Sequence, residues 1–83
     1  MTVPEIMPDV QAEFMFGLID YQTWNLYIGN KWVGQLTVNH ADRSVTLGLD
    51  DMSNAEKWFP QCYGYRTWIA WLRTHVRPGR SRI

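Results

Sequence analysis

The stretch WNLYIGNKWVGQLTVNHADRSVTLGL, which spans residues 24–49, decides the fold. Apolar and polar residues alternate along three short runs within it, and this alternation is typical of β-strands with one buried face. Gly29 and Asn30 separate the first two runs and accept the backbone conformations of a tight hairpin turn. Residues 40–43 form a second turn before the third run. The stretch therefore predicts an antiparallel meander of three strands.

Strict alternation assigns each residue of this meander to one of two faces. The face toward the core is expected to carry Trp24, Leu26, Ile28, Trp32, Gly34, Leu36, Val38, Val45, Leu47 and Leu49. The outward face is expected to carry Asn25, Tyr27, Val33, Gln35, Thr37 and Thr46. One face of the sheet is therefore predicted to be apolar and the other largely polar.

The outward face is unusual because it is almost free of charge. Lys31 is the only charged residue from Tyr21 to Ala41. Strands that face solvent commonly carry charges, partly because charges prevent pairing with other chains. We therefore expect something to cover this face. One candidate is the N-terminal segment, and the other is a partner protein or a second copy of the chain. The N-terminal segment would act through Val3, Ile6, Met7 and Val10.

Residues 9–19, before the meander, fit two structures. Asp9 could cap a short helix that carries Val10, Phe14 and Leu18 on one face. Alternatively, Phe14, Phe16 and Leu18 alternate as they would in a strand. We favour a strand over residues 13–19, which would give the sheet a fourth member.

Two helices are expected after the meander. Ser53 and Glu56 have the spacing of a capping box, which predicts a short helix starting near Asn54 and ending before Pro60. A longer amphipathic helix is predicted from Tyr65 to Val76, because five apolar residues fall on one stripe. They are Tyr65, Trp68, Ile69, Leu72 and Val76. The predicted fold class is α+β: a meander of three or four strands, packed on its apolar face by the C-terminal helix, with the short helix between them.

The 83 residues are enough for one domain, and we treat residues 1–83 as a single domain. Residues 1–8 contain two prolines and are expected to be extended, and residues 78–83 are expected to be a flexible basic tail. No apolar run approaches the length of a membrane span, and the N-terminus has no signal-like pattern. Cys62 is the only cysteine, so no intrachain disulfide can form. We therefore expect a cytoplasmic protein that does not bind membranes.

The formal net charge is zero, which argues against a dedicated nucleic-acid binder. The charges are unevenly placed, however. Every charged residue among residues 1–30 is acidic, and every charged residue among residues 66–83 is basic. The basic residues are Arg66, Arg73, Arg77, Arg80 and Arg82. These arginines either attract the acidic end of the same chain or form a basic patch for an acidic partner.

No arrangement of residues points to catalysis. His40, His75 and Cys62 are the only imidazole and thiol groups, and they do not have the spacing of a metal site. The chain has no phosphate-binding glycine loop and no nucleophile elbow. We therefore predict no enzymatic activity, no cofactor and no metal.

Trp71 is the tryptophan that we expect at a surface, because it lies off the apolar stripe of the last helix and beside His75. Partly exposed tryptophans are enriched at protein interfaces. Together with the uncharged sheet face, this gives five predicted partner-binding residues, which are Trp71, His75, Tyr27, Val33 and Gln35.

The preferred function is non-catalytic binding of another protein. Small aromatic-rich domains of this kind are common among proteins of phages and other mobile elements, which bind and inhibit a host or defence protein in the host cytoplasm. One alternative is a nucleic-acid-associated accessory protein that uses the arginine-rich C-terminal end. Several DNA-binding domains also place a helix after a three-stranded sheet, but they read DNA through basic strand residues, which the outward face here lacks. The other alternative is a structural subunit that self-associates, as a homodimer, through the uncharged face.

Overall fold

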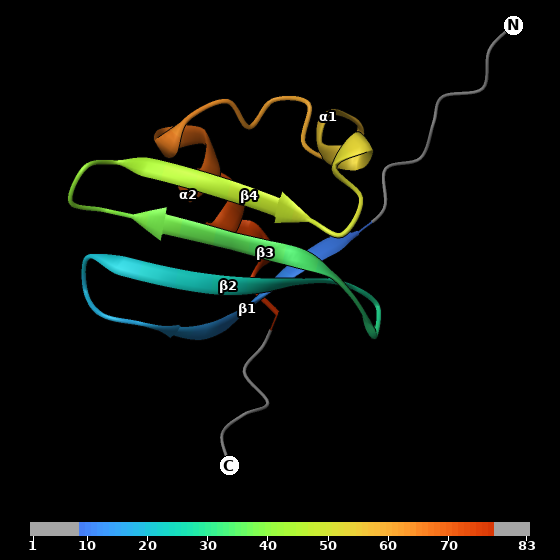
Figure 1. Ribbon diagram of the computed structural model, residues 1–83, viewed down its shortest axis with the longest axis horizontal. Helices are drawn as coiled ribbons and strands as arrows, with labels where there is room; N and C mark the ends of the chain where they lie inside the picture. The colour runs from blue at the N-terminus through green and yellow to red at the C-terminus, as the bar shows by residue number, and fades with distance from the viewer. Residues whose placement is uncertain (1–8, 78–83) are drawn as a thin grey trace, which may run out of the picture.

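The structure is a computed structural model that describes residues 9–77 (Figure 1). Four strands form one antiparallel sheet in the order β1-β2-β3-β4, so residues 9–19 contribute a strand and not a helix. A short 3-10 turn and two helices follow. The elements are β1 (Val10–Gly17), β2 (Tyr21–Ile28), β3 (Lys31–Asn39), β4 (Ser44–Leu49), η1 (Met52–Asn54), α1 (Ala55–Trp58) and α2 (Tyr65–His75). The predicted α+β fold class is confirmed.

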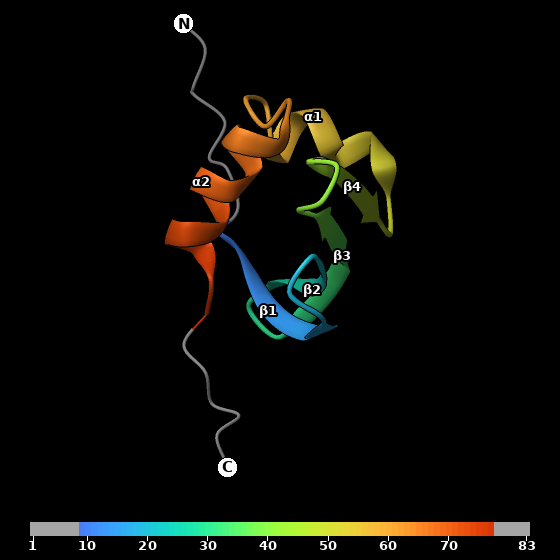
Figure 2. The ribbon, with the colours of Figure 1, turned by 90° about the vertical axis from the view of Figure 1, so that its left-hand side faces the viewer.

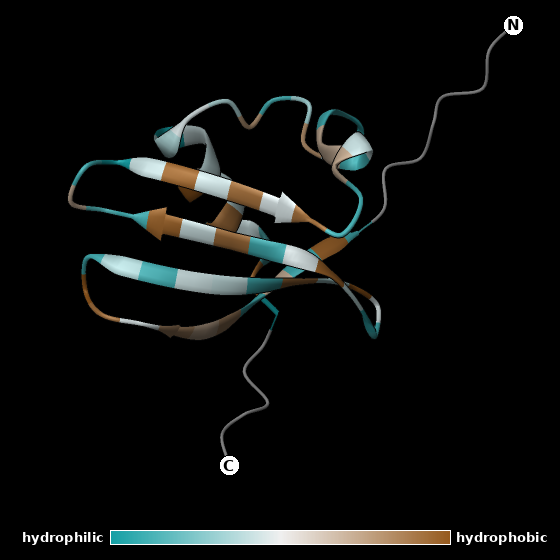
Figure 3. Ribbon diagram, in the orientation of Figure 1, coloured by the Kyte–Doolittle hydropathy of each residue, from teal (hydrophilic) through white to brown (hydrophobic). Residues whose placement is uncertain are grey.

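The sheet is strongly curved, and both helices lie on its concave side (Figure 2). α2 contacts β1 and β4, which are the two edge strands, and so closes the open side of the curve. Apolar and polar residues alternate along the strands as bands of colour (Figure 3). The core between the layers consists of Val10, Ala12, Leu26, Val33, Leu36, Val38, Leu49, Phe59, Trp68 and Leu72.

A β-bulge reverses two of the predicted face assignments. Leu26 of β2 pairs with Gly34 of β3, but Tyr27 pairs with Trp32, so Val33 has no partner on β2. Because β3 has this one extra residue, the side chain of the residue before Val33 points to the opposite face from the one that strict alternation assigns. Val33 is consequently only 5% exposed and belongs to the core, whereas Trp32 is 44% exposed. The predicted outward position of Val33, and the predicted core position of Trp32, were therefore wrong.

The predicted capping box at α1 is also wrong. The residue that caps this region is Asp51, whose carboxylate accepts hydrogen bonds from the backbone N–H of Ser53 at 3.1 Å and from its hydroxyl at 2.7 Å. These bonds favour the charged form and lower the pKa of Asp51. The chain first forms η1, and α1 begins at Ala55 with no side-chain cap from Asn54.

α2 buries Trp68 and Leu72 and half-buries Tyr65 and Ile69, as its predicted apolar stripe requires. The helix ends at His75, and Val76 instead makes a parallel β-bridge to Ala12 of β1. The expectations for residues 1–8 and 78–83, including Val3, Ile6, Met7, Arg80 and Arg82, lie outside the described residues. Within residues 9–77, no helix is long and apolar enough to cross a membrane.

Candidate protein-binding surface

The β1–β2 hairpin ends in a tight turn. Leu18 and Tyr21 exchange backbone hydrogen bonds, with N···O distances of 2.8 and 3.4 Å, and leave Ile19 and Asp20 at the tip. Gly17 precedes the turn with a φ of 152°, and a Cβ on this residue would overlap the Tyr21 carbonyl oxygen. A side chain is therefore excluded at residue 17, and this glycine permits the close approach of the two strands.

Several large apolar side chains close to this turn in the sequence are exposed. Leu18 is 81% exposed and Ile19 is 89% exposed, which is extreme for aliphatic residues. Their exposed neighbours are the side chains of Phe14, Met15, Phe16 and Tyr21. We call these six residues the hairpin surface. Large exposed apolar side chains gathered at one end of a hairpin are typical of interaction sites on proteins.

A second bulge makes the hairpin surface two-sided. Phe14 pairs with Trp24 and Phe16 pairs with Thr23, so Met15 is the extra residue of β1. Because Thr23 and Trp24 are neighbours in β2, they point to opposite faces of the sheet. Phe14 therefore lies on the concave side, where its ring meets Trp24 edge-on at 5.2 Å, and Phe16 lies on the convex side. The hairpin thus presents apolar side chains in both directions.

We expect Gly17→Ala to lower the free energy of unfolding by about 1–3 kcal/mol, because the added methyl group overlaps backbone and the φ is unfavourable for alanine. Urea denaturation followed by circular dichroism measures this change. Gly48→Ala is the matched control, since a Cβ there meets nothing within 4 Å. Equal midpoints for both variants would mean that the hairpin end does not have this geometry.

The predicted site residues Trp71 and His75 lie together at the margin of the core. Their rings are stacked, with centroids 4.5 Å apart and an angle of 6° between the planes. His75 Nδ1 lies 2.8 Å from the Trp71 carbonyl oxygen, which holds the imidazole in place. Trp71 is half-buried and meets Phe59 and Trp68 edge-on at 5.3 and 5.6 Å. Trp71 is therefore a member of an aromatic cluster with part of its surface exposed.

Tyr27 faces outward as predicted, but a residue of the same chain covers it. The Arg77 guanidinium lies 4.6 Å from the centre of the Tyr27 ring and donates a 2.6 Å hydrogen bond to the Gly29 carbonyl. The Arg77 backbone N–H also donates to the Ala12 carbonyl at 2.9 Å. Arg77 therefore passes over the edge of β1 and fastens the end of α2 to the convex side of the sheet.

Gln35 belongs to a polar cluster on the same convex side. Its amide donates to Asn25 Oδ1 at 3.4 Å, and the Trp32 indole N–H donates to the same oxygen at 3.0 Å. Asn25 in turn donates to the Met15 sulfur at 3.1 Å. The polar side chains at this part of the uncharged face thus bond to one another and to Met15. Val10, expected to help cover it, lies in the core instead.

The predicted basic patch is divided by the structure. Arg66 and Arg73 are exposed on α2, but Arg77 is engaged with the sheet. Arg80 and Arg82 lie outside the described residues. Of the five predicted arginines, the described part of the chain therefore leaves two free for a partner.

The candidate reactive side chains have structural roles or unfavourable surroundings. His40 Nδ1 lies 2.5 Å from the Tyr65 hydroxyl and Nε2 lies 3.0 Å from Gln22 Oε1, so His40, in the turn between β3 and β4, links β2 to α2. Burial raises the pKa of the Cys62 thiol, which disfavours the nucleophilic thiolate. Among residues 9–77, no group of three or more His, Cys, Asp and Glu side chains could hold a metal ion.

Comparison with known proteins gives no family assignment. The chain matches no protein-family model. It also matches no curated protein and no solved structure. The residues themselves therefore carry the functional argument.

Sequence reasoning missed the hairpin surface. The run FMFGLI, residues 14–19, has no charged residue and places Leu18 and Ile19 where a turn normally has polar residues. Aliphatic residues in a turn were the available signal. Of the five predicted partner-binding residues, Trp71 and His75 contact each other. Tyr27 and Gln35 lie apart from them on the sheet, and Val33 is buried.

Proposed function

We propose that this chain is a non-catalytic protein-binding domain whose contact surface is the hairpin surface. The exposure of Leu18 and Ile19 carries the proposal. Removal of two aliphatic side chains from water by a partner lowers the free energy of the complex and so favours binding. Phe14, Phe16 and Tyr21 supply the aromatic contact area that interfaces favour.

The geometry of the hairpin supports this role. Its turn is fixed by paired backbone hydrogen bonds and by the close approach at Gly17, so the apolar side chains stand on a defined scaffold. A defined scaffold lowers the entropic cost of binding. We extend the proposal to an inhibitor, because a small domain that binds through an apolar hairpin acts by occupying a surface of its partner. Its origin in a phage or mobile element stays a prediction.

The nucleic-acid alternative has less support. Phosphate contacts supply most of the affinity of nucleic-acid binders, and Arg66 and Arg73 are the free arginines among the described members of the predicted patch. Aromatic and aliphatic contacts are far less sensitive to salt than phosphate contacts are. Binding that persists at high salt therefore favours a protein partner.

The test is the double variant Leu18→Ser, Ile19→Ser. We expect it to fold as the wild type does, because exposed turn residues contribute little to stability. We expect its affinity for the captured partner to fall at least about tenfold, as for central interface residues. Affinity capture identifies the partner, calorimetric titration measures the affinity, and a thermal melt checks the fold.

Met52→Ser is the matched control, since Met52 is 53% exposed but lies in η1, outside both the hairpin surface and the β1–β2 hairpin. It should bind the captured partner with wild-type affinity. Two results would contradict the proposal. One is unchanged binding of the double variant. The other is a wild-type chain that is dimeric in solution while the double variant is monomeric, which would assign the hairpin surface to self-association.

A further inference from the structure

The outer edge of β4 is an unpaired strand edge. β4 pairs with β3 alone, and no other segment between residues 9 and 77 joins the sheet beside it. Edge strands are usually protected by charges or proline, because their free backbone groups can pair with another chain. β4 has the sequence SVTLGL, with no charge and no proline.

The register of the sheet shows which residues present these groups. The Asp50 N–H donates to the Val33 carbonyl at 2.8 Å and extends the β3–β4 ladder. Hydrogen-bonded pairs alternate along an antiparallel ladder. The even-numbered residues of β4 therefore direct their backbone N–H and C=O groups to β3, and the odd-numbered residues direct theirs to the free edge. The Leu49 N–H accordingly bonds outside the sheet, to the Met52 sulfur at 3.1 Å. Val45 and Leu47 therefore direct backbone N–H and C=O groups to the free edge.

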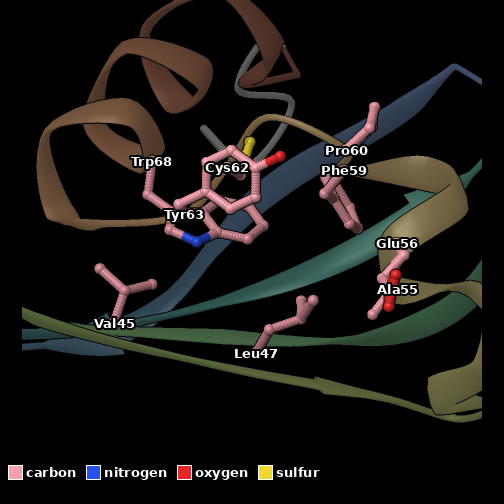
Figure 4. A pocket seen from close by; sticks show the side chains of 9 residues that line it. All are labelled: Val45, Leu47, Ala55, Glu56, Phe59, Pro60, Cys62, Tyr63 and Trp68. Atoms are coloured by element: carbon pink, nitrogen blue, oxygen red, sulfur yellow. The ribbon is translucent and has the colours of Figure 1, made fainter.

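The side chains of the same two residues face a cleft. Val45 pairs with Val38 and Leu47 pairs with Leu36, so both point to the concave side of the sheet. There they line one side of a cleft of about 560 Å³, between β4 and the helical layer (Figure 4). The other lining residues are Ala55, Glu56, Phe59, Pro60, Cys62, Tyr63 and Trp68.

The cleft has an aromatic end and an acidic end. Tyr63 and Trp68 lie over Val45, whereas Glu56 lies at the far end beyond Leu47 (Figure 4). Glu56 is exposed and is the only charged residue in the lining. The cleft therefore complements a ligand with apolar groups along most of its length and a positive charge at one end.

We propose that the β4 edge and this cleft bind an extended segment of a partner protein by antiparallel strand addition. The segment pairs its backbone with Val45 and Leu47, and its residues directly opposite them place their side chains in the cleft. Alternate positions of the segment are therefore apolar. A lysine or arginine at one end meets Glu56.

A second copy of the chain fits the cleft less well. Its own Val45 and Leu47 already line its own cleft, so it has no free side chains to place in this one. A free extended segment has them. This site lies on the opposite edge strand from β1 and does not depend on the hairpin surface.

The probe is the synthetic peptide acetyl-Lys-Ser-Val-Ser-Leu-Ser-Val-Ser-Lys-amide, whose N-terminal lysine lies at the Glu56 end when the peptide pairs antiparallel to β4. Calorimetric titration with the full chain should detect binding. A peptide of the same composition with its apolar residues contiguous should bind at least about tenfold more weakly. The same loss is expected when the Val and Leu amides of the probe are N-methylated, since these N–H groups face β4. Hydrogen exchange at the Val45 and Leu47 amides should slow when the probe binds.

Variants of the chain separate the two sites. Tyr63→Ser and Leu47→Lys should weaken probe binding at least about tenfold, while Thr46→Lys, on the other face of β4, should not. The Leu18→Ser, Ile19→Ser variant should bind the probe as the wild type does. Failure of the hairpin proposal therefore leaves this result unaffected.

Three outcomes would overturn the proposal. The first is the absence of probe binding, and the second is equal affinity for the alternating and contiguous peptides. The third is a dimeric chain whose Val45 and Leu47 amides are protected without any peptide, which would show that a second copy occupies the edge. Glu56→Gln should remove the preference for lysine-ended over serine-ended peptides, and a preference that persists would contradict the charge assignment.

Discussion

Leu36→Ala is expected to lower the free energy of unfolding by about 4 kcal/mol. Leu36 has no exposed surface and lies in β3, an interior strand of the sheet. It pairs with Trp24 on one side and with Leu47 on the other, so truncation leaves a cavity between three strands. Domains of this size have a total stability of roughly 5–10 kcal/mol, and the variant should lose a large part of it. Urea denaturation followed by circular dichroism measures the change.

Thr46→Ala is the control for this prediction, because Thr46 is exposed on the opposite face of the neighbouring strand. It should change the free energy of unfolding by less than about 0.5 kcal/mol. If both substitutions had the same small effect, the assignment of the concave face as the core would be wrong.

Trp68→Ala is expected to cost about 3–5 kcal/mol, since it removes the largest buried side chain of α2. The indole fills the space between Phe59 and the sheet, with its ring centre 4.9 Å from that of Phe59. Thermal melts and urea titrations of the variant give the change in stability. Retention of the wild-type melting temperature would mean that α2 does not dock through Trp68.

Trp71→Ala provides the comparison within the same helix. Trp71 is half-buried and packs at the margin of the aromatic cluster, so its loss should cost less than that of Trp68. The difference distinguishes a core residue from one whose exposed part is free for a partner. An equal loss of stability would assign Trp71 wholly to the core.

The regular parts of the sheet could be predicted from alternation alone. Leu26, Leu36 and Val38 are completely buried, as their positions in the pattern require. The pattern failed at Trp32 and Val33 because both residues are apolar and alternation assumes that every residue has a partner across the ladder. Gly34 was a hint, since a glycine within a strand often marks a bulge.

The hairpin surface and the position of Arg77 depend on tertiary structure. Phe14, Phe16 and Leu18 have a strand pattern whether or not a helix covers them. Among the described residues, Val76 follows α2 and bridges to Ala12, near the opposite end of β1 from the hairpin turn. The placement of Arg77 over Tyr27 joins residues far apart in sequence, and no local pattern predicts such a contact.

The bridge between Ala12 and Val76 joins β1, the first strand, to the residue that follows α2, and this affects how the protein folds during its synthesis. During synthesis, β1 to β4 leave the ribosome before α2. The sheet can therefore form while its concave face and the edge of β1 beside Ala12 are still open to water. Exposed apolar faces and open strand edges are the features that make nascent chains aggregate. The domain reaches its protected form only after Arg77 has left the ribosome. Slow translation of the last helix should therefore favour aggregation, and a chaperone that binds the nascent chain should reduce it.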